Sequence, residues 1–150
     1  MDLASPKLEL FYTKGKIKGA VGGRGSVKSW GWAQALVILM TNYRMRVLCC
    51  REIQKSIKAS SYQLIVDTID RYGKTKDFEI LKTEIRHLGT GSLVIFAGLK
   101  TNPESIKSGE GFDLAIVEEA ENVTDHSIKI LHPTVFRNKG AQVWYIWNRR

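Results

Sequence analysis

Apolar residues occur along the chain in short runs that glycine and polar residues separate. Runs with the length and content of β-strands lie at residues 16–21, 46–50, 78–81, 84–88, 92–97, 112–117 and 142–147. Longer segments favour helices at residues 29–40 and 53–72, and Asp125 is expected to cap a short helix that ends before His132-Pro133. Strands that alternate with helices predict an α/β fold with a mostly parallel central sheet flanked by helices.

The length and composition indicate one globular domain over residues 1–150. Of the 150 residues, 43% are hydrophobic and 25% are charged, which supplies enough apolar surface to bury a core. The longest apolar run, at residues 35–40, is far too short to cross a membrane. We therefore expect no membrane partner.

The charge balance favours a polyanionic partner. The formal net charge is +8, which suits nucleic acid, nucleotide phosphates or an anionic surface. A basic protein without such a partner is the alternative. Cys49 and Cys50 are the only cysteines, and neighbouring cysteines on a strand face opposite sides, so they rarely bridge each other. Without a disulfide framework, the sequence suggests a reducing cytosol.

A glycine-rich segment, VGGRGSVKSW at residues 21–30, lies between the first predicted strand and the first predicted helix. It has the form of a phosphate-binding loop, whose backbone N–H groups curl around phosphate oxygens at the positive end of a helix. Lys28 stands where such a loop has the lysine for the β- and γ-phosphates, and Ser29 where it has the hydroxyl for Mg²⁺. A glycine-rich turn without a ligand is the alternative.

Residue 27 departs from the usual pattern G-x-x-x-x-G-K-[ST], because valine stands where the pattern has glycine. A β-branched residue at positive φ would be strained. The sequence thus leaves two possibilities: either the loop uses a negative φ at Val27, or the pocket is strained.

Two acids, Glu118 and Glu119, come directly after the predicted strand at residues 112–117. In an ATPase, one carboxylate after such a strand holds the Mg²⁺ shell and the next orients and deprotonates the attacking water. Acids placed at a helix N-terminus for its dipole are the alternative. Together the glycine-rich loop and the acidic motif predict a P-loop NTPase of the ASCE type, with an additional strand between the two strands that carry these motifs.

The ordered set of motifs resembles the large terminase subunits of tailed bacteriophages, which are ATP-driven DNA-packaging motors. GGRGSVKS resembles the phosphate loop of that family, CREIQKSIKASSYQLI the segment after its second strand, and IVEEAE its acidic motif. GSLVIFAGLKTNPESIKS resembles the stretch before the acidic motif, and LHPTVFRNKGAQVWYIWN the approach to the coupling motif. The similarity runs over about residues 16–148.

The resemblance implies a role for individual residues. Lys28 would bind phosphate, Ser29 and Glu118 would hold Mg²⁺, and Glu119 would be the catalytic base. Arg24 would stabilise charge at the γ-phosphate, although a solvated loop residue is the alternative, and Asn148 would belong to the coupling motif that links hydrolysis to movement. The ATP-binding residues would be Gly22, Gly23, Arg24, Gly25, Ser26, Val27, Lys28, Ser29 and Asn148.

The resemblance also implies partners and a place in the cell. Double-stranded DNA would be contacted without sequence preference, and a portal protein and a small terminase subunit would be protein partners in the host cytoplasm. We expect no DNA cleavage by this chain, because the acids of the family's nuclease domain are absent from it. Two other functions stay open: a helicase or recombination ATPase, and a catalytically impaired remnant that binds DNA or a protein partner. Val27, the early end of the chain, and Arg149 at a position where the family commonly has proline would favour the remnant.

Overall fold

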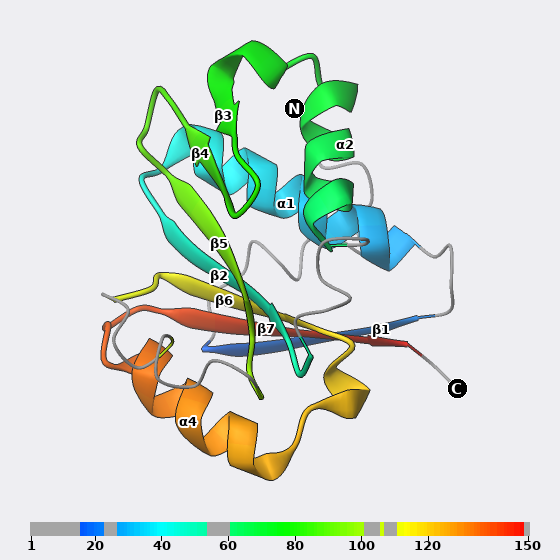
Figure 1. Cartoon of the computed structure of the whole chain (residues 1–150), viewed down its shortest axis with the longest axis vertical. Helices are drawn as coiled ribbons and strands as arrows, with labels where there is room; N and C mark the ends of the chain where they lie inside the picture. The colour runs from blue at the N-terminus through cyan, green and yellow to red at the C-terminus, as the bar shows by residue number, and fades with distance from the viewer. Residues whose placement is uncertain (1–15, 23–26, 54–60, 101–105, 107–110, 149–150) are drawn as a thin grey trace.

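The computed structural model describes residues 16–22, 27–53, 61–100, 106 and 111–148, and at 20–22, 27–30 and 148 only the backbone. Its strands form one 7-stranded sheet in the order β1-β7-β6-β2-β5-β4-β3 (Figure 1). The strands are β1 (Ile17–Gly22), β2 (Arg46–Arg51), β3 (Phe78–Ile80), β4 (Glu84–His87), β5 (Leu93–Gly98), β6 (Leu114–Glu118) and β7 (Gln142–Asn148). In the order of the sheet, the neighbouring strands β1, β7, β6, β2 and β5 all run parallel to one another. Strand β4 pairs antiparallel with β5, and β3 pairs antiparallel with β4. The predicted α/β fold with a mostly parallel sheet is confirmed.

Helices cover both faces of the sheet, α1 (Val27–Asn42) and α2 (Gln63–Arg71) on one face and α4 (Asp125–Phe136) on the other (Figure 1). The core has two parts, one on each face. Trp32 of α1 and Trp144 of β7 are fully buried in the core on the α1 side of the sheet. Leu131 and Val135 of α4 belong to the core on the opposite side. No described helix is long and apolar enough to cross a membrane.

Strand β2 is buried on both sides, as its apolar sequence predicts for a central parallel strand. Because successive side chains of a strand point to opposite faces, Cys49 packs in the core on the α1 side and Cys50 in the core on the α4 side. Both thiols are free, as expected.

The prediction for the helix near residue 125 was wrong at both of its ends. Helix α4 does not stop before Pro133 but continues to Phe136. Pro133 is exposed, so the carbonyl it leaves without a partner can reach water. The N-cap is Thr124 rather than Asp125, because the Thr124 hydroxyl accepts the Ser127 N–H.

The helix expected at residues 53–72 begins later than predicted. Helix α2 starts at Gln63, residues 54–60 lie outside the described part, and Ile53 is exposed in a bend after β2. Ile53 matched the helical spacing of the buried Ile65 and Ile69 by coincidence, since it does not share their buried face.

The sheet order determines where the sequence motifs meet. Strand β7 lies between β1, which leads into the glycine-rich loop, and β6, which ends in the acidic motif. This is the predicted additional strand. Ligands of such sheets bind beyond the carboxyl ends of the strands, and β1, β7, β6 and β2 all end at the same edge.

Candidate nucleotide-binding site

The glycine-rich loop has the strand-loop-helix context that phosphate binding requires. Gly22 ends β1, and Val27 begins α1, so Lys28 and Ser29 lie in the first turn of that helix. Gly23, Arg24, Gly25 and Ser26 lie outside the described residues. The first turn of a helix leaves backbone N–H groups without partners inside the helix and carries the positive end of the helix dipole, and these are the elements of an anion site.

The position of Val27 removes the steric objection to this loop. Val27 is the first residue of α1 and has helical backbone geometry. Among the described non-glycine residues, only Glu119 has a positive φ. The glycine of the usual pattern is therefore not needed here for its backbone freedom, and valine is a better helix former than glycine.

The two acids of the second motif lie at the carboxyl end of β6. Glu118 is the last residue of the strand, and Glu119 follows it in a left-handed conformation, with φ 51° and ψ 47°. A left-handed backbone is unfavourable for a residue with a side chain, and such residues concentrate at functional sites. This conformation turns the chain sharply after Glu118 into a single 3₁₀ turn, η5 (Ala120–Asn122).

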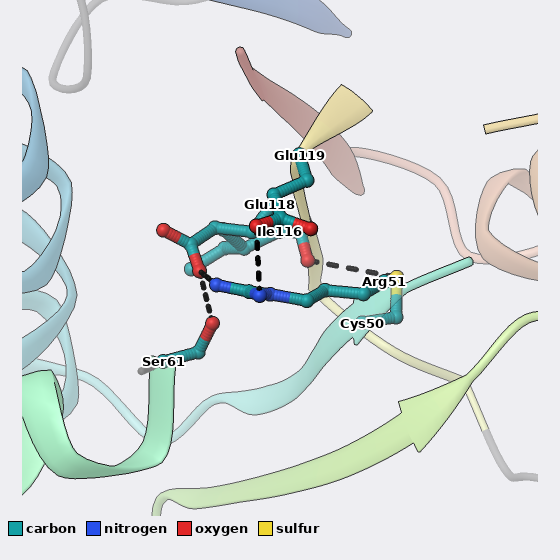
Figure 2. A network of polar contacts seen from close by, with 6 residues as sticks. All are labelled: Cys50, Arg51, Ser61, Ile116, Glu118 and Glu119. Atoms are coloured by element: carbon teal, nitrogen blue, oxygen red, sulfur yellow. Dashed lines mark hydrogen bonds and ion pairs between the residues drawn. The ribbon is translucent and has the colours of Figure 1, made fainter. Parts of the chain in front are cut away.

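Arg51 joins the two acids. Its Nη2 lies 2.7 Å from Oε2 of Glu118 and its Nη1 lies 3.1 Å from Oε1 of Glu119, as Figure 2 shows. Strand register explains the meeting, because Cys50 of β2 lies beside Val117 of β6, which places Arg51 beside Glu118. The side chains of Arg51 and Glu118 are only 6% and 13% exposed, whereas that of Glu119 is 40% exposed. Glu118 is thus fixed within the protein, and Glu119 faces the solvent side.

Ser61 completes the surroundings of Glu118. Its buried hydroxyl donates a hydrogen bond to Oε2 of Glu118, the oxygen that Arg51 also contacts (Figure 2). Burial raises the pKa of the neighbouring Cys49 thiol, and the Glu118 carboxylate raises this pKa further. Cys49 therefore stays a neutral thiol and does not act as a nucleophile in this site.

Sequence reasoning missed Arg51 and Ser61. Both lie in the segment CREIQKSIKASS, which suggested only a likeness to a family. A cation directly after a buried strand of a parallel sheet was an available signal, because the carboxyl edge of the sheet was already the expected site.

The acids fit a magnesium-assisted site. Within the described part of the chain, no three His, Cys, Asp or Glu side chains come together as a metal cage. Mg²⁺ does not need such a cage, since proteins usually hold it through one or two carboxylates, substrate phosphates and water. Each carboxylate oxygen has two lone pairs, so the contact with Arg51 leaves Glu118 able to accept further ligands.

Asn148 meets the glycine-rich loop through the backbone of the sheet. It is the last residue of β7 and pairs with Gly22, the last residue of β1 before the loop. Arg149 lies outside the described residues. The structure thus brings Gly22, Asn148, Glu118 and Glu119 to one edge of the sheet.

Comparison with known proteins agrees with this geometry. A family model described as phage terminase large subunit matches residues 14–149. The PBSX phage terminase large subunit of Bacillus subtilis (strain 168) is 30% identical over 112 residues, which cover 74% of this chain and 26% of that protein. The chain thus spans about a quarter of the length of this curated relative.

Solved structures share the fold. The large terminase ATPase domain of Thermus phage P74-26 has a TM-score of 0.74 at 14% identity, covering 97% of this chain and 64% of that one. The large terminase of a thermophilic bacteriophage, solved in complex with ADP, has a TM-score of 0.65 at 12% identity, covering 96% of this chain and 35% of that one.

Proposed function

Because the chain belongs to the phage terminase large subunit family, we propose that it is the ATP-hydrolysing domain of a DNA-packaging motor. In this proposal it binds Mg·ATP at the carboxyl edge of the sheet and uses hydrolysis to move double-stranded viral DNA into a procapsid. The observation that carries the proposal is the meeting, at this edge, of the loop entry at Gly22 with Glu118 and Glu119, which Arg51 holds together.

Binding would depend on the first turn of α1. The backbone N–H groups of the loop and of this turn would surround the phosphates, and Lys28 would reach the β- and γ-phosphates. Ser29 and Glu118 would hold Mg²⁺, which would neutralise negative charge on the phosphates.

Hydrolysis would depend on Glu119. Its exposed carboxylate would orient a water and accept the proton as the water oxygen bonds to the γ-phosphorus and the bond to the β–γ bridging oxygen breaks, which releases ADP and phosphate. Arg24 would stabilise the charge that develops on the γ-phosphate. Asn148, joined to Gly22 through the sheet, would report the state of the phosphate loop to the rest of the motor.

The partners follow from the charge and the family. A net charge of +8 supports sequence-independent contact with DNA phosphates, which weakens as the salt concentration rises. A portal protein and a small terminase subunit are the protein partners that we propose, in the cytoplasm of the host. The idea of an impaired remnant loses the argument from Val27, because a helical backbone at this residue needs no glycine.

The first test is Mg·ATP binding by isothermal titration calorimetry on the wild-type chain, on Lys28→Ala and on Lys129→Ala. Lys129 is an exposed lysine of α4, so its variant controls for the loss of one positive charge. The proposal expects binding by the wild type and by Lys129→Ala and none by Lys28→Ala. Equal affinity in all three proteins would refute the phosphate-loop assignment.

The second test separates binding from hydrolysis. Glu119→Gln keeps the shape of the side chain but removes the base, so it should bind Mg·ATP normally while phosphate release falls at least about a hundredfold. Hydrolysis at the wild-type rate would remove Glu119 from the mechanism.

A further inference from the structure

Glu52, the residue after Arg51, is a buried acid that the proposed chemistry does not use. It is only 8% exposed. Its Oε1 accepts hydrogen bonds from the hydroxyls of Thr124, at 3.0 Å, and Ser127, at 2.9 Å. Its Oε2 is buried and has no hydrogen-bond partner among the described residues.

The two hydroxyls belong to the start of α4, and the segment that leads there carries Glu119. From Glu119 the chain makes the turn η5 and reaches Thr124, the N-cap of α4. Two backbone hydrogen bonds define the turn, Asn122 N–H to Glu119 O at 2.9 Å and Val123 N–H to Ala120 O at 3.1 Å. Only four residues lie between Glu119 and Thr124, so we expect a shift of Thr124 to move Glu119.

Arg51 and Glu52 hold this segment at opposite ends. Arg51 contacts Glu118 and Glu119 at the beginning, and Glu52 contacts Thr124 at the end. The backbone of both residues is itself fixed, because their carbonyls accept the N–H groups of Leu99 and Lys100 at 2.8 and 2.9 Å. Arg51 and Glu52, which are neighbours at the end of β2, therefore hold the two ends of the segment from fixed backbone positions.

We propose that Glu52 is a positioning residue for Glu119: by holding Thr124 and Ser127, it keeps the strained turn after Glu118 in the geometry that aims the Glu119 carboxylate. A helix cap alone would need only the Thr124 hydroxyl, which already accepts the Ser127 N–H at 3.2 Å. The consequence for catalysis rests on the proposed ATPase function, whereas the consequence for the turn does not.

Amide hydrogen exchange, followed by NMR on the full chain, tests the turn without any need for activity. In Glu52→Ala the amides of Asn122 and Val123 should exchange at least about tenfold faster than in the wild type, because a local opening loses the hydrogen bonds that oppose it. Glu52→Gln keeps an acceptor oxygen and should stay within about threefold of the wild type. Glu79→Gln, an exposed acid on β3, controls for charge loss.

An exchange increase confined to Ser127 and Ile128 would overturn the proposal, because Glu52 would then be an ordinary partner of the helix N-terminus. Should Glu52→Ala fail to fold, Glu52→Asp withdraws the carboxylate from both hydroxyls by one methylene and decides the same question, with unchanged Asn122 and Val123 exchange again counting against the proposal.

ATP turnover supplies the catalytic readout. Glu52→Ala should lower kcat about tenfold or more while the Kd for Mg·ATP stays within about twofold of the wild type, and Glu52→Gln should restore most of kcat. A lower thermal stability with unchanged kcat would overturn the positioning role. A wild-type chain that neither binds nor hydrolyses ATP would defeat the proposed function instead, and the exchange result would still decide the role of Glu52 in the turn.

Discussion

Removing the Arg51 side chain should destabilise the protein more than the loss of any surface ion pair. The Arg51 guanidinium and the Glu118 carboxylate are nearly buried and lie 2.7 Å apart. Breaking a buried pair by removing one partner costs roughly 3–5 kcal/mol, because the other charge stays buried without compensation. The contact with Glu119 adds little, since that carboxylate is 40% exposed and solvent screens it. We expect about 3 kcal/mol for Arg51→Ala, which is a shift of roughly 10 °C in Tm for a chain of this size.

A double-mutant cycle isolates the pair from these side effects. Arg51→Ala, Glu118→Gln and the combined variant are unfolded in urea, and the coupling energy is the non-additive part of the three changes. For Arg51 and Glu118 it should be about 1.5–3 kcal/mol. The matched control is the Arg86–Glu84 pair, which is 3.7 Å apart with side chains 43% and 29% exposed, and which should give less than about 0.5 kcal/mol.

A coupling energy below about 0.5 kcal/mol for Arg51 and Glu118 would refute the reasoning. It would mean that water or rearranged neighbours replace the guanidinium easily, and that Glu118 is not held by this contact. A change in the slope of the urea transition would point instead to a changed unfolded state, so the cycle is read only where the slopes agree.

Further predictions concern the neighbouring strands. A side chain at Gly19 would place its Cβ 2.6 Å from the Trp147 ring, so Gly19→Ala should cost roughly 1–3 kcal/mol in urea unfolding, and an unchanged midpoint would contradict this packing. Burial, with a smaller effect of Cys50, raises the pKa of Tyr145 to about 12, above its ordinary value of 10.0. The folded state therefore keeps this proton longer than the unfolded chain, so stability should fall as the pH rises from about 10 to about 12, and Tyr145→Phe should flatten that fall. Burial raises the pKa of both Cys49 and Cys50, so neither thiol should react with a thiol reagent before unfolding, and fast labelling of the native protein would contradict their placement.

The sequence was informative wherever a local pattern determines local structure. The apolar run 46–50 predicted the buried β2 and the opposite faces of Cys49 and Cys50, because alternation within a strand is a property of the backbone. The glycine-rich loop correctly indicated a strand before it and a helix after it, because these elements are its neighbours along the chain.

Long-range pairing was harder to predict. An additional strand between those of the two motifs was expected, but which strand takes that place depends on which strand edges pair, and hydrophobic periodicity says nothing about that choice. Arg51 lies 2.7 Å from Glu118 only because β2 and β6 are neighbours in register, so spacing along the chain did not reveal the contact. The end of α4 was misplaced because proline was taken as a stop signal, although a proline on an exposed side can remain within a helix.

The left-handed backbone of Glu119 sets activity against stability at that position. A residue with a side chain pays roughly 1–2 kcal/mol to adopt this conformation, whereas asparagine and glycine adopt it at a lower cost. Glu119→Asn or Glu119→Gly should therefore relieve strain while it abolishes the carboxylate. Redesign for thermal stability that ignores function would favour such replacements, and it would remove the proposed catalytic base as it strengthened the fold. A library selected only for folding should lose glutamate at position 119, and one selected for the proposed ATP hydrolysis should keep it.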